Sequence, residues 1–387
     1  MIKRSGVWPW VWMVIVLAPI RAVWADELKM GMSSAFSGLA AALGTGIRQG
    51  VEARLEQVNA SGGVHGHVLR LIALDDGYEP RRAAPNVRQL IEKENVLALI
   101  GNVGTPTAVV TVPIAQQAHT VLFGAYSGGA LLRKQPPDRH IINFRASYRE
   151  ETAAMVTGLL ESGVRPEQIA FFTQNDSFGD DGYHGALETL NAMGYRQGDK
   201  LPHGRYTRNT LNVEEGLGVI LAAPVEPRAI ILVGSYKPCA AFVRLAKKEL
   251  PKTVFLMVSF VGSEPLVREL GGDAEGVIVT QVVPSLDDHS PAVREYRQLM
   301  VELGITPGYL SLEGYLMARL FTLGLEKVGP DPTRKGVLDA LESLGKVDIG
   351  MGSGLHLSRE EHQASHHVWP TIYRNGQFVP LDWKKAW

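Results

Sequence analysis

Short apolar runs of strand length alternate with stretches of helical period along most of this 387-residue chain. The run at residues 229–233, Ala-Ile-Ile-Leu-Val, contains no polar residue, which is typical of strands buried on both faces of a parallel sheet. Between such runs, Ile47, Val51, Leu55 and Val58 recur on one helical face before a Gly-Gly pair ends the helix. The alternation predicts a doubly wound α/β architecture.

The other expected elements follow the same two patterns. Strands are expected at residues 69–74, 96–101, 120–124, 141–144, 169–173, 229–234, 253–258 and 276–280. Further helices are expected from Pro85 onward and at residues 150–162, 181–193, 212–222, 240–250 and 291–303. Because no repeat, low-complexity tract or flexible linker separates two halves, we expect the chain to cross between lobes within the sheet system itself.

Residues 1–25 have the pattern of a secretory signal peptide. A basic start and an apolar stretch lead to a V-x-A ending at Ala25, so the mature chain is expected to begin at Asp26. An uncleaved membrane anchor is the alternative, which Pro9 and Pro19 disfavour because they interrupt a stretch already short for a bilayer. The prediction is a soluble protein of the periplasm.

Composition narrows the classes of function. The mature chain has room for two domains of about 100–200 residues each. Loss of Lys3, Arg4 and Arg21 with the leader would take the formal net charge from -1 to about -4, which argues against a nucleic-acid surface. Cys239 is the one cysteine of the sequence, so an intramolecular disulfide is excluded, and we expect it to be a small buried apolar residue.

No motif for catalysis, a cofactor or a metal meets its required spacing. Gly44-x-Gly46-x-x-x-Gly50 misses both nucleotide-binding fingerprints. His362-x-x-x-His366-His367 has helical metal-ligand spacing but lacks an adjacent glutamate, and solvated surface is expected there. Ser127 lies in Tyr-Ser-Gly-Gly, which is not the G-x-S-x-G elbow. We therefore assign no catalytic, cofactor-binding or metal-binding residue, and a periplasmic hydrolase is the least favoured function.

Polar loops follow the expected strands, at the sheet edge where open parallel sheets bind ligands. These loops are residues 33–46, 101–107, 124–129, 145–151, 174–179, 234–238 and 259–263. Their hydroxyls and backbone amides suit a carboxylate, while their aromatic residues could cover the apolar part of a small ligand. For any single Ser, Thr, Asn or Asp, capping of the following helix is the alternative role. Their recurrence after several strands favours a binding cleft.

Six segments carry a resemblance to a known family. They are residues 32–38, 59–66, 75–80, 101–107, 143–148 and 174–179. The first of these segments is Met-Ser-Ser-Ala-Phe-Ser-Gly, and the last is Gln-Asn-Asp-Ser-Phe-Gly. With them the chain resembles the type I periplasmic solute-binding proteins of ABC transporters, in the branched-chain amino-acid (Leu/Ile/Val)-binding family.

The resemblance implies two doubly wound parallel-sheet lobes joined by a three-crossing hinge, with the ligand in the cleft between them. The first lobe would comprise residues 26–145 plus 281–345 and the second residues 146–280 plus 346–387, with hinges near Arg145, Thr280 and Ile349.

The resemblance also implies which residues contact the ligand. Thr105 and the turn at residues 127–129 match the hydroxyls and amides that hold a carboxylate, and Phe178 and Tyr236 match aromatic residues of the second lobe. The expected ligand-binding set is Leu43, Gly104, Thr105, Tyr126, Ser127, Gly129, Tyr148, Phe178, Tyr236, Ser259 and Phe260.

Two departures from the family pattern stand out. Ser259 aligns with the acidic residue that holds an amino acid's ammonium group, and a buried ammonium without a counter-charge would cost on the order of several kcal/mol. Either another carboxylate such as Glu313 replaces it, or the ligand is not an α-amino acid. Tyr78 and Gly104 occupy the positions of a disulfide found in some relatives, so that link is absent.

The expected function is capture of a small carboxylate or amino-acid-like ligand by hinge closure and its delivery to the membrane permease of an ABC importer. No enzyme activity, cofactor or nucleic acid is expected. The alternative is a sensory receptor that reports the same ligand to a membrane kinase or chemoreceptor.

Overall fold

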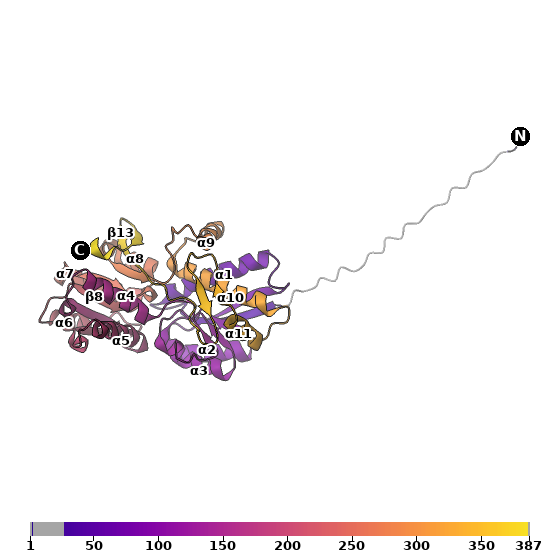
Figure 1. The fold of residues 1–387 in the computed structure, drawn as a ribbon, viewed down its shortest axis with the longest axis horizontal. Helices are drawn as coiled ribbons and strands as arrows, with labels where there is room; N and C mark the ends of the chain where they lie inside the picture. The colour runs from indigo at the N-terminus through magenta and orange to yellow at the C-terminus, as the bar shows by residue number, and fades with distance from the viewer. Residues whose placement is uncertain (1, 3–26, 386–387) are drawn as a thin grey trace.

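A computed structural model describes residue 2 and residues 27–385. Residues 27–385 form two lobes that lie side by side (Figure 1). The expected leader, apart from residue 2, and its cleavage point after Ala25 lie outside the described residues. Within the described part of the chain, every helix is too short or too polar to cross a membrane.

The first lobe is built on a parallel sheet with the strand order β2-β1-β3-β4-β5. Its strands are β1 (Glu27–Ser34), β2 (Val68–Asp75), β3 (Ala98–Ile100), β4 (Val121–Phe123) and β5 (Ile141–Ile142). Its helices are α1 (Ala41–Ala60), α2 (Pro80–Glu92), α3 (Thr105–Gln117), α9 (Pro291–Glu302), α10 (Tyr309–Val328) and α11 (Arg334–Glu342). The strand order reverses between β1 and β3, and in open parallel sheets ligands commonly bind beyond the carboxyl ends of the strands at such a reversal.

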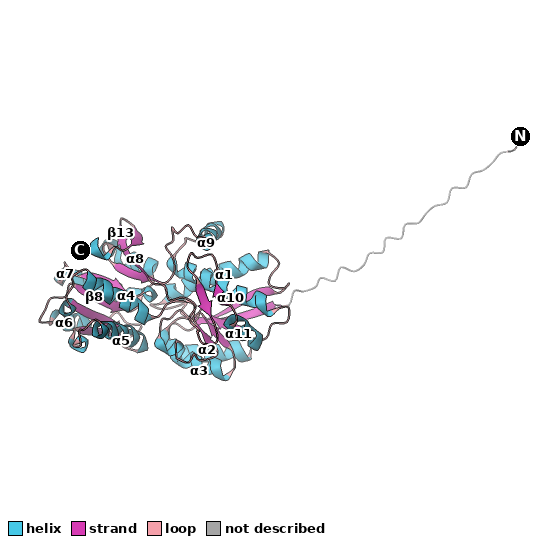
Figure 2. Cartoon of the chain, viewed as in Figure 1, coloured by secondary structure: helices cyan, strands magenta, loops and turns pink. Residues whose placement is uncertain are grey.

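The second lobe is built on a sheet with the order β14-β13-β10-β9-β8-β6-β7. Its parallel strands are β6 (Ile169–Gln174), β7 (His203–Tyr206), β8 (Ala229–Val233), β9 (Val254–Met257) and β10 (Ile278–Gln281). The hairpin of β13 (Trp369–Arg374) and β14 (Gln377–Pro380) adds an antiparallel edge. Its helices are α4 (Tyr148–Glu161), α5 (Ser177–Ala192), α6 (Glu214–Leu221), α7 (Tyr236–Glu249) and α8 (Ser263–Leu270) (Figure 2). The predicted α/β class with parallel sheets is confirmed.

Three expected helix starts were late: α5 begins at Ser177 and α7 at Tyr236, before the expected starts at residues 181 and 240, and the start of α2 was also placed too late. α2 begins at Pro80, not at Pro85, which lies inside the helix. A proline at the first helical position is tolerated because that N–H has no partner within the helix anyway. Cys239 is buried, as expected.

The described chain passes between the two sheets after β5, again after β10, and finally between β12 (Leu355–Leu357) and β13. β12 pairs with β11 (Gly345–Val347) in a small separate sheet. The Asn143 N–H donates to His362 O at 2.7 Å, and the Ala364 N–H donates to Asn143 O at 2.9 Å. These bonds hold the segment ending at Ala364 beside the first lobe, so the last passage lies later than the expected boundary at 345/346.

The histidine motif divides in the structure. His362 is 4% exposed, and its Nδ1 lies 2.9 Å from Ile141 O, so the expectation of solvated surface was wrong for this residue. His366 and His367 are exposed. Within residues 27–385, no group of His, Cys, Asp or Glu has an arrangement that could hold a metal ion.

Glycines set the distance between α1 and α10, which lie side by side in the first lobe (Figure 1). A Cβ on Gly50 would stand 1.9 Å from Ser311 O, and a Cβ on Gly314 would stand 2.3 Å from Ile47 O. Gly46 and Gly50 of the spaced glycines therefore serve the packing of α1 against the start of α10, whereas a Cβ on Gly44 would stand 2.1 Å from Ala35 O.

We predict that Gly50→Ala lowers the free energy of unfolding by about 1–3 kcal/mol, because the added methyl group would displace the backbone of α10. The matched control is Gly218→Ala in α6, where a Cβ meets no atom within 4 Å. That change is expected to stabilise the helix by up to about 1 kcal/mol. Urea titrations of both variants measure the difference, and equal effects would contradict the packing role.

Candidate ligand cleft between the lobes

The first lobe presents hydroxyl groups and a turn amide at the lobe interface. Gly104 has φ of +106°, a backbone conformation that favours glycine, and it leads directly into Thr105 at the start of α3. Thr105 Oγ1 lies 2.7 Å from Ser127 Oγ, and Ser127 Oγ accepts the Gly129 N–H at 3.1 Å. Both hydroxyls are completely buried. The residues that the sequence assigned to carboxylate binding are therefore adjacent in space.

A third hydroxyl comes from the start of α4. The Tyr148 N–H donates to Gly128 O at 3.0 Å, which places the ring against the Ser127 turn. Tyr148 Oη faces Thr105 and Ser127, but no described residue completes a well-formed hydrogen bond with it. Burial raises the pKa of Tyr148 to about 12, so the phenol stays a neutral donor. Three hydroxyl groups thus converge from the two lobes.

Aromatic rings from both lobes fill the interface around Phe260. The Phe260 ring centroid lies 4.5 Å from that of Phe178, 5.0 Å from Tyr126 and 5.9 Å from Tyr78. Tyr148 contacts Phe178 with a centroid distance of 4.9 Å. All five side chains are at most 2% exposed, so this cluster forms an apolar wall beside the hydroxyls.

The remaining expected residues are also buried and contact residues of the same interface. Tyr236 Oη accepts the Ala42 N–H from the other lobe at 3.4 Å. A Cβ on Gly262 would stand 2.6 Å from Leu43 Cδ2, so Leu43 packs beside the loop that carries Phe260. Gly104 packs against Tyr78, where an added Cβ would lie 2.2 Å from Cε2. The structure thus brings the whole expected set together, and its ligand-binding role stays a prediction.

Arg145 is the main residue of the interface that the sequence did not assign to the site. It is 1% exposed, its Nη2 lies 3.2 Å from Glu151 Oε1, and its Nη1 lies 3.4 Å from Glu313 Oε1. Its Cζ lies 4.7 Å from the centre of the Tyr126 ring. Although burial opposes it, the carboxylates of Glu313 and Glu151 raise the pKa of Arg145. In the sequence, the only indication of this role was that Arg145 is a single positively charged residue directly after the strand expected at residues 141–144.

Ser259 belongs to this charged cluster. Its N–H and its hydroxyl donate to Glu151 at 2.7 and 3.0 Å, and its Oγ also accepts a hydrogen bond from Arg145. Thr280 Oγ1 donates to Glu151 at 2.6 Å. Tyr126 Oη donates to Ser259 O at 2.9 Å. The Ser259 hydroxyl therefore adds a side-chain donor to the Glu151 carboxylate, which an ionised acidic side chain at this position could not supply.

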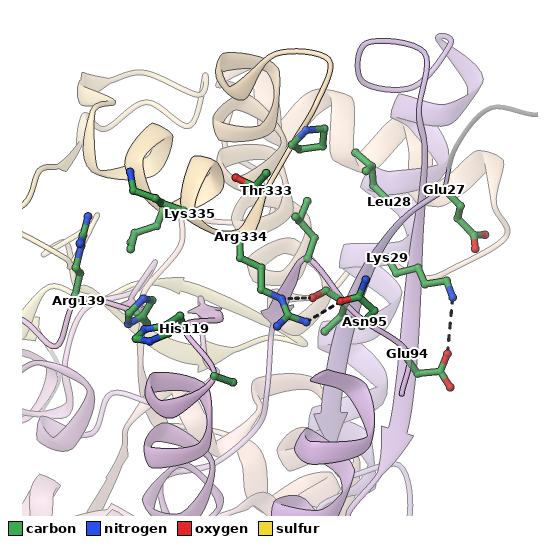
Figure 3. A pocket seen from close by; sticks show the side chains of 16 residues that line it. Glu27, Leu28, Lys29, Glu94, Asn95, His119, Arg139, Thr333, Arg334 and Lys335 are labelled. Carbon is green, nitrogen blue, oxygen red and sulfur yellow. Dashed lines mark hydrogen bonds and ion pairs between the residues drawn. The ribbon is translucent and has the colours of Figure 1, made fainter. Parts of the chain in front are cut away.

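A cavity of about 1050 Å3 lies elsewhere, near the beginnings of β1 and α11 (Figure 3). Arg334 there donates to Val96 O at 3.0 Å and to Asn95 Oδ1 at 3.2 Å, and Lys29 pairs with Glu94 at 3.9 Å. These cations are engaged by neighbouring groups, and the cavity lies at the end of the sheet opposite the hydroxyl cluster.

The profile of the family described as "Periplasmic binding protein" matches residues 27–377. The chain belongs to the periplasmic binding protein family. It is 25% identical over 368 residues to the Leu/Ile/Val-binding protein homolog 7 of Brucella abortus, covering 88% of each chain. A solved structure titled as a "possible leucine/isoleucine/valine-binding protein" from Rhodopirellula baltica SH 1 is 45% identical, with a TM-score of 0.91 over 94% of this chain and 98% of that one. The substrate-binding periplasmic protein of Ralstonia solanacearum is 26% identical, with a TM-score of 0.83 over 92% of this chain and 100% of that one. The predicted family is confirmed.

In this periplasmic binding protein, Glu150 and His366 join the first and last passages between the sheets. Glu150 Oε1 lies 2.6 Å from His366 Nδ1, while Oε2 accepts the Ser147 N–H at 2.6 Å and Gln363 Nε2 at 2.9 Å. Although burial opposes it, the bonds from His366 and Ser147 lower the pKa of Glu150 to about 2. The bond to Glu150 in turn raises the pKa of His366.

We predict that His366→Gln destabilises the protein most between about pH 4.5 and 6.5. The raised pKa of His366 gives stability that is fully present below 6.5 and is lost as the pH rises through its folded pKa. The lowered pKa of Glu150 gives stability that is present above 4.5 and is lost as the pH falls towards about 2. Denaturant titrations across pH measure this window. The exposed His289→Gln is the control with little expected change, and a pH-independent loss in His366→Gln would contradict the paired ionisation.

We predict that Arg145→Met lowers the free energy of unfolding by about 3–5 kcal/mol, because it leaves two buried carboxylates without their cation. The loss should be smaller at pH 5 than at pH 8, since protonation relieves the unpaired carboxylates. The control Arg149→Met breaks an exposed pair with Glu188 and should cost less than about 1 kcal/mol. Chemical denaturation at both pH values tests this, and equal losses in the two variants would refute it.

Proposed function

We propose that this periplasmic binding protein is the substrate-binding component of an ABC importer. It captures a small carboxylate or amino-acid-like ligand between its lobes in the periplasm and delivers it to a membrane permease. The family match supports binding rather than catalysis, and the Leu/Ile/Val-binding names of its relatives support a ligand of this class.

One observation carries the proposal: the hydroxyls of Thr105, Ser127 and Tyr148 converge beside the Gly129 amide. A carboxylate accepts several hydrogen bonds, and bonds to a charged acceptor are stronger than neutral ones. The hydroxyl of Tyr148 already lacks a partner among the described residues. The wall around Phe260 suits the apolar part of a small molecule.

Contacts across the rim support capture by closure. Asn209 Nδ2 donates to Glu79 Oε1 at 2.6 Å, Arg208 pairs with Glu79 at 3.1 Å, and Gln174 Nε2 donates to Tyr78 Oη at 3.2 Å. These bonds join the loop after β2 to the second lobe. Since the rings meet across the interface, a ligand enters when the lobes separate and Phe260 moves aside. Binding then favours closure to the extent that the ligand contacts both lobes.

We predict that Thr105→Val weakens ligand affinity about 10- to 100-fold without unfolding the protein, because valine keeps the shape but removes a hydrogen bond to a charged group. Ligands are first found by thermal unfolding against a panel of amino acids and aliphatic and aromatic carboxylates, since saturation at about 100 times Kd adds about 2.7 kcal/mol. Calorimetry then compares the variants.

The control is Thr111→Val, a buried threonine of the same helix outside the hydroxyl cluster, which should leave affinity unchanged. Equal affinity of Thr105→Val and the parent protein would remove Thr105 from the site. The absence of any thermal shift across the panel would count against the proposed function itself.

A further inference from the structure

The turn at residues 127–129 is held by an arginine that the sequence did not assign to the site. The carbonyl oxygens of Ser127 and Gly129 both accept hydrogen bonds from Nη1 of Arg133, each at 3.1 Å. Through other atoms the same two residues belong to the hydroxyl cluster, since Ser127 Oγ lies 2.7 Å from Thr105 Oγ1 and accepts the Gly129 N–H. One nitrogen of Arg133 therefore fixes both ends of the turn and leaves its hydroxyl and amide at the proposed carboxylate site.

The same guanidinium contacts two of the passages between the lobes. Its Nη2 donates to Arg145 O in the first passage at 2.9 Å, and its Nε donates to Gln363 Oε1 in the last passage at 2.7 Å. Gln363 is itself held there, because its Nε2 donates to Glu150 Oε2 at 2.9 Å. A planar guanidinium can serve several separate acceptors at once, whereas a lysine ammonium is a compact point charge. The position of the turn is therefore tied to the segments that join the lobes.

Arg133 brings a positive charge that the protein does not pair. Its four acceptors are carbonyl oxygens, three of the backbone and one of an amide side chain. Among residues 27–385, no carboxylate forms an ion pair or a hydrogen bond with it. Burial and the nearby charge of Arg145 lower the pKa of Arg133 to about 10, so the side chain stays a cation near neutral pH.

This charge lies close behind the proposed carboxylate site. The carbonyl that Arg133 holds and the N–H that points to Ser127 Oγ both belong to Gly129, so a single residue separates the cation from the site. Inside a protein the effective dielectric constant is lower than in water, and a charge acts more strongly over such a distance. The hydroxyl cluster is neutral, so Arg133 gives the site a charge opposite to that of a carboxylate.

We propose that Arg133 is a positioning residue for the carboxylate of the ligand: it fixes the turn at residues 127–129 from behind and supplies the positive charge that the bound carboxylate meets through that turn. The proposal rests on the proposed function for the presence of a carboxylate ligand. It adds the residue that makes a site of neutral hydroxyls select an anion.

Two substitutions separate the clamp from the charge. Arg133→Met removes both, and Arg133→Lys keeps the charge without the planar fork. Each carboxylate probe is paired with its own uncharged primary amide: L-leucine with L-leucinamide, 4-methylpentanoate with 4-methylpentanamide, and phenylacetate with phenylacetamide. Thermal unfolding of the wild type selects the pair whose carboxylate gives the largest shift. Calorimetry then measures both dissociation constants of that pair, with the weaker amide measured by competition.

In Arg133→Met, the preference for the carboxylate over its amide should fall about tenfold or more, because a charge is lost behind a charged group. In Arg133→Lys, that preference should stay within about threefold of the wild type, while the carboxylate itself binds about fivefold or more weaker because the turn loses its clamp. The matched control is Arg334→Met. It removes a guanidinium that also holds Ile91 O, Val96 O and Asn95, at the opposite end of the sheet (Figure 3), and both dissociation constants should stay unchanged.

The outcomes distinguish this proposal from the proposed function. A merely structural role for Arg133 would weaken the carboxylate and the amide equally in Arg133→Met, and that result would overturn the proposal while the proposed function stands. If Arg133→Met does not fold, Arg133→Lys decides: wild-type affinity for the carboxylate would overturn the clamp, and a lost preference over the amide would overturn the charge. No thermal shift of the wild type with any of the six compounds would overturn both the proposed function and this proposal.

Discussion

Arg145 between Glu151 and Glu313 is the interaction on which the closed arrangement of the two lobes depends. Arg145 lies in the first passage between the sheets, Glu151 on α4 of the second lobe, and Glu313 on α10 of the first. Taking charges out of water is costly, and only good geometry with further hydrogen bonds offsets that cost. Because Glu313 is far in the sequence from Arg145 and Glu151, the cluster satisfies its charges only when α10 and the segment at residues 145–151 are correctly placed.

The aromatic rings of the interface pack directly against this charged cluster. The guanidinium lies over one ring, Tyr126, which stacks on Phe260, which in turn contacts Phe178. A cation near an aromatic face is attracted by the negative charge of that face, and the ring shields the cation from solvent. The charged cluster therefore orients the ring wall, and the ring wall separates the cluster from the hydroxyls at Thr105.

The sequence predicted most of the parallel-sheet framework because buried parallel strands are continuously apolar, as β8 shows. It missed β1, which contains no β-branched residue and in which Lys29 and Gly31 interrupt the apolar positions, although residues 30–34 of the strand are buried. It also missed α10, which is buried around most of its circumference and so lacks a one-sided apolar stripe. The antiparallel hairpin of β13 and β14 carries no signal of which sheet it will join.

The candidate site was partly predictable for a related reason. Loops that follow parallel strands meet at one sheet edge, so the hydroxyls near Thr105 and Ser127 could be placed together from local sequence alone. The contact between Arg145 and Glu313 could not, because α10 reaches the interface only through the packing of glycines against α1. The sequence also could not show that the amide and the hydroxyl of Ser259, in the second lobe, donate hydrogen bonds to Glu151.

The two carboxylates beside Arg145 show how environment divides the roles of chemically identical groups. Glu151 is surrounded by donors, so its charge is fully engaged within the protein and no acceptor capacity is left for a ligand. Glu313 shares the same guanidinium but lines a small cavity with both polar and apolar walls, and burial raises its pKa to about 7. When two nearby acids differ in this way, one holds the structure and the other can change its partner. Within this cluster, the serine that aligns with an acid is engaged with Glu151, and Glu313 is the carboxylate that has the guanidinium but no hydrogen-bond donor among the described residues.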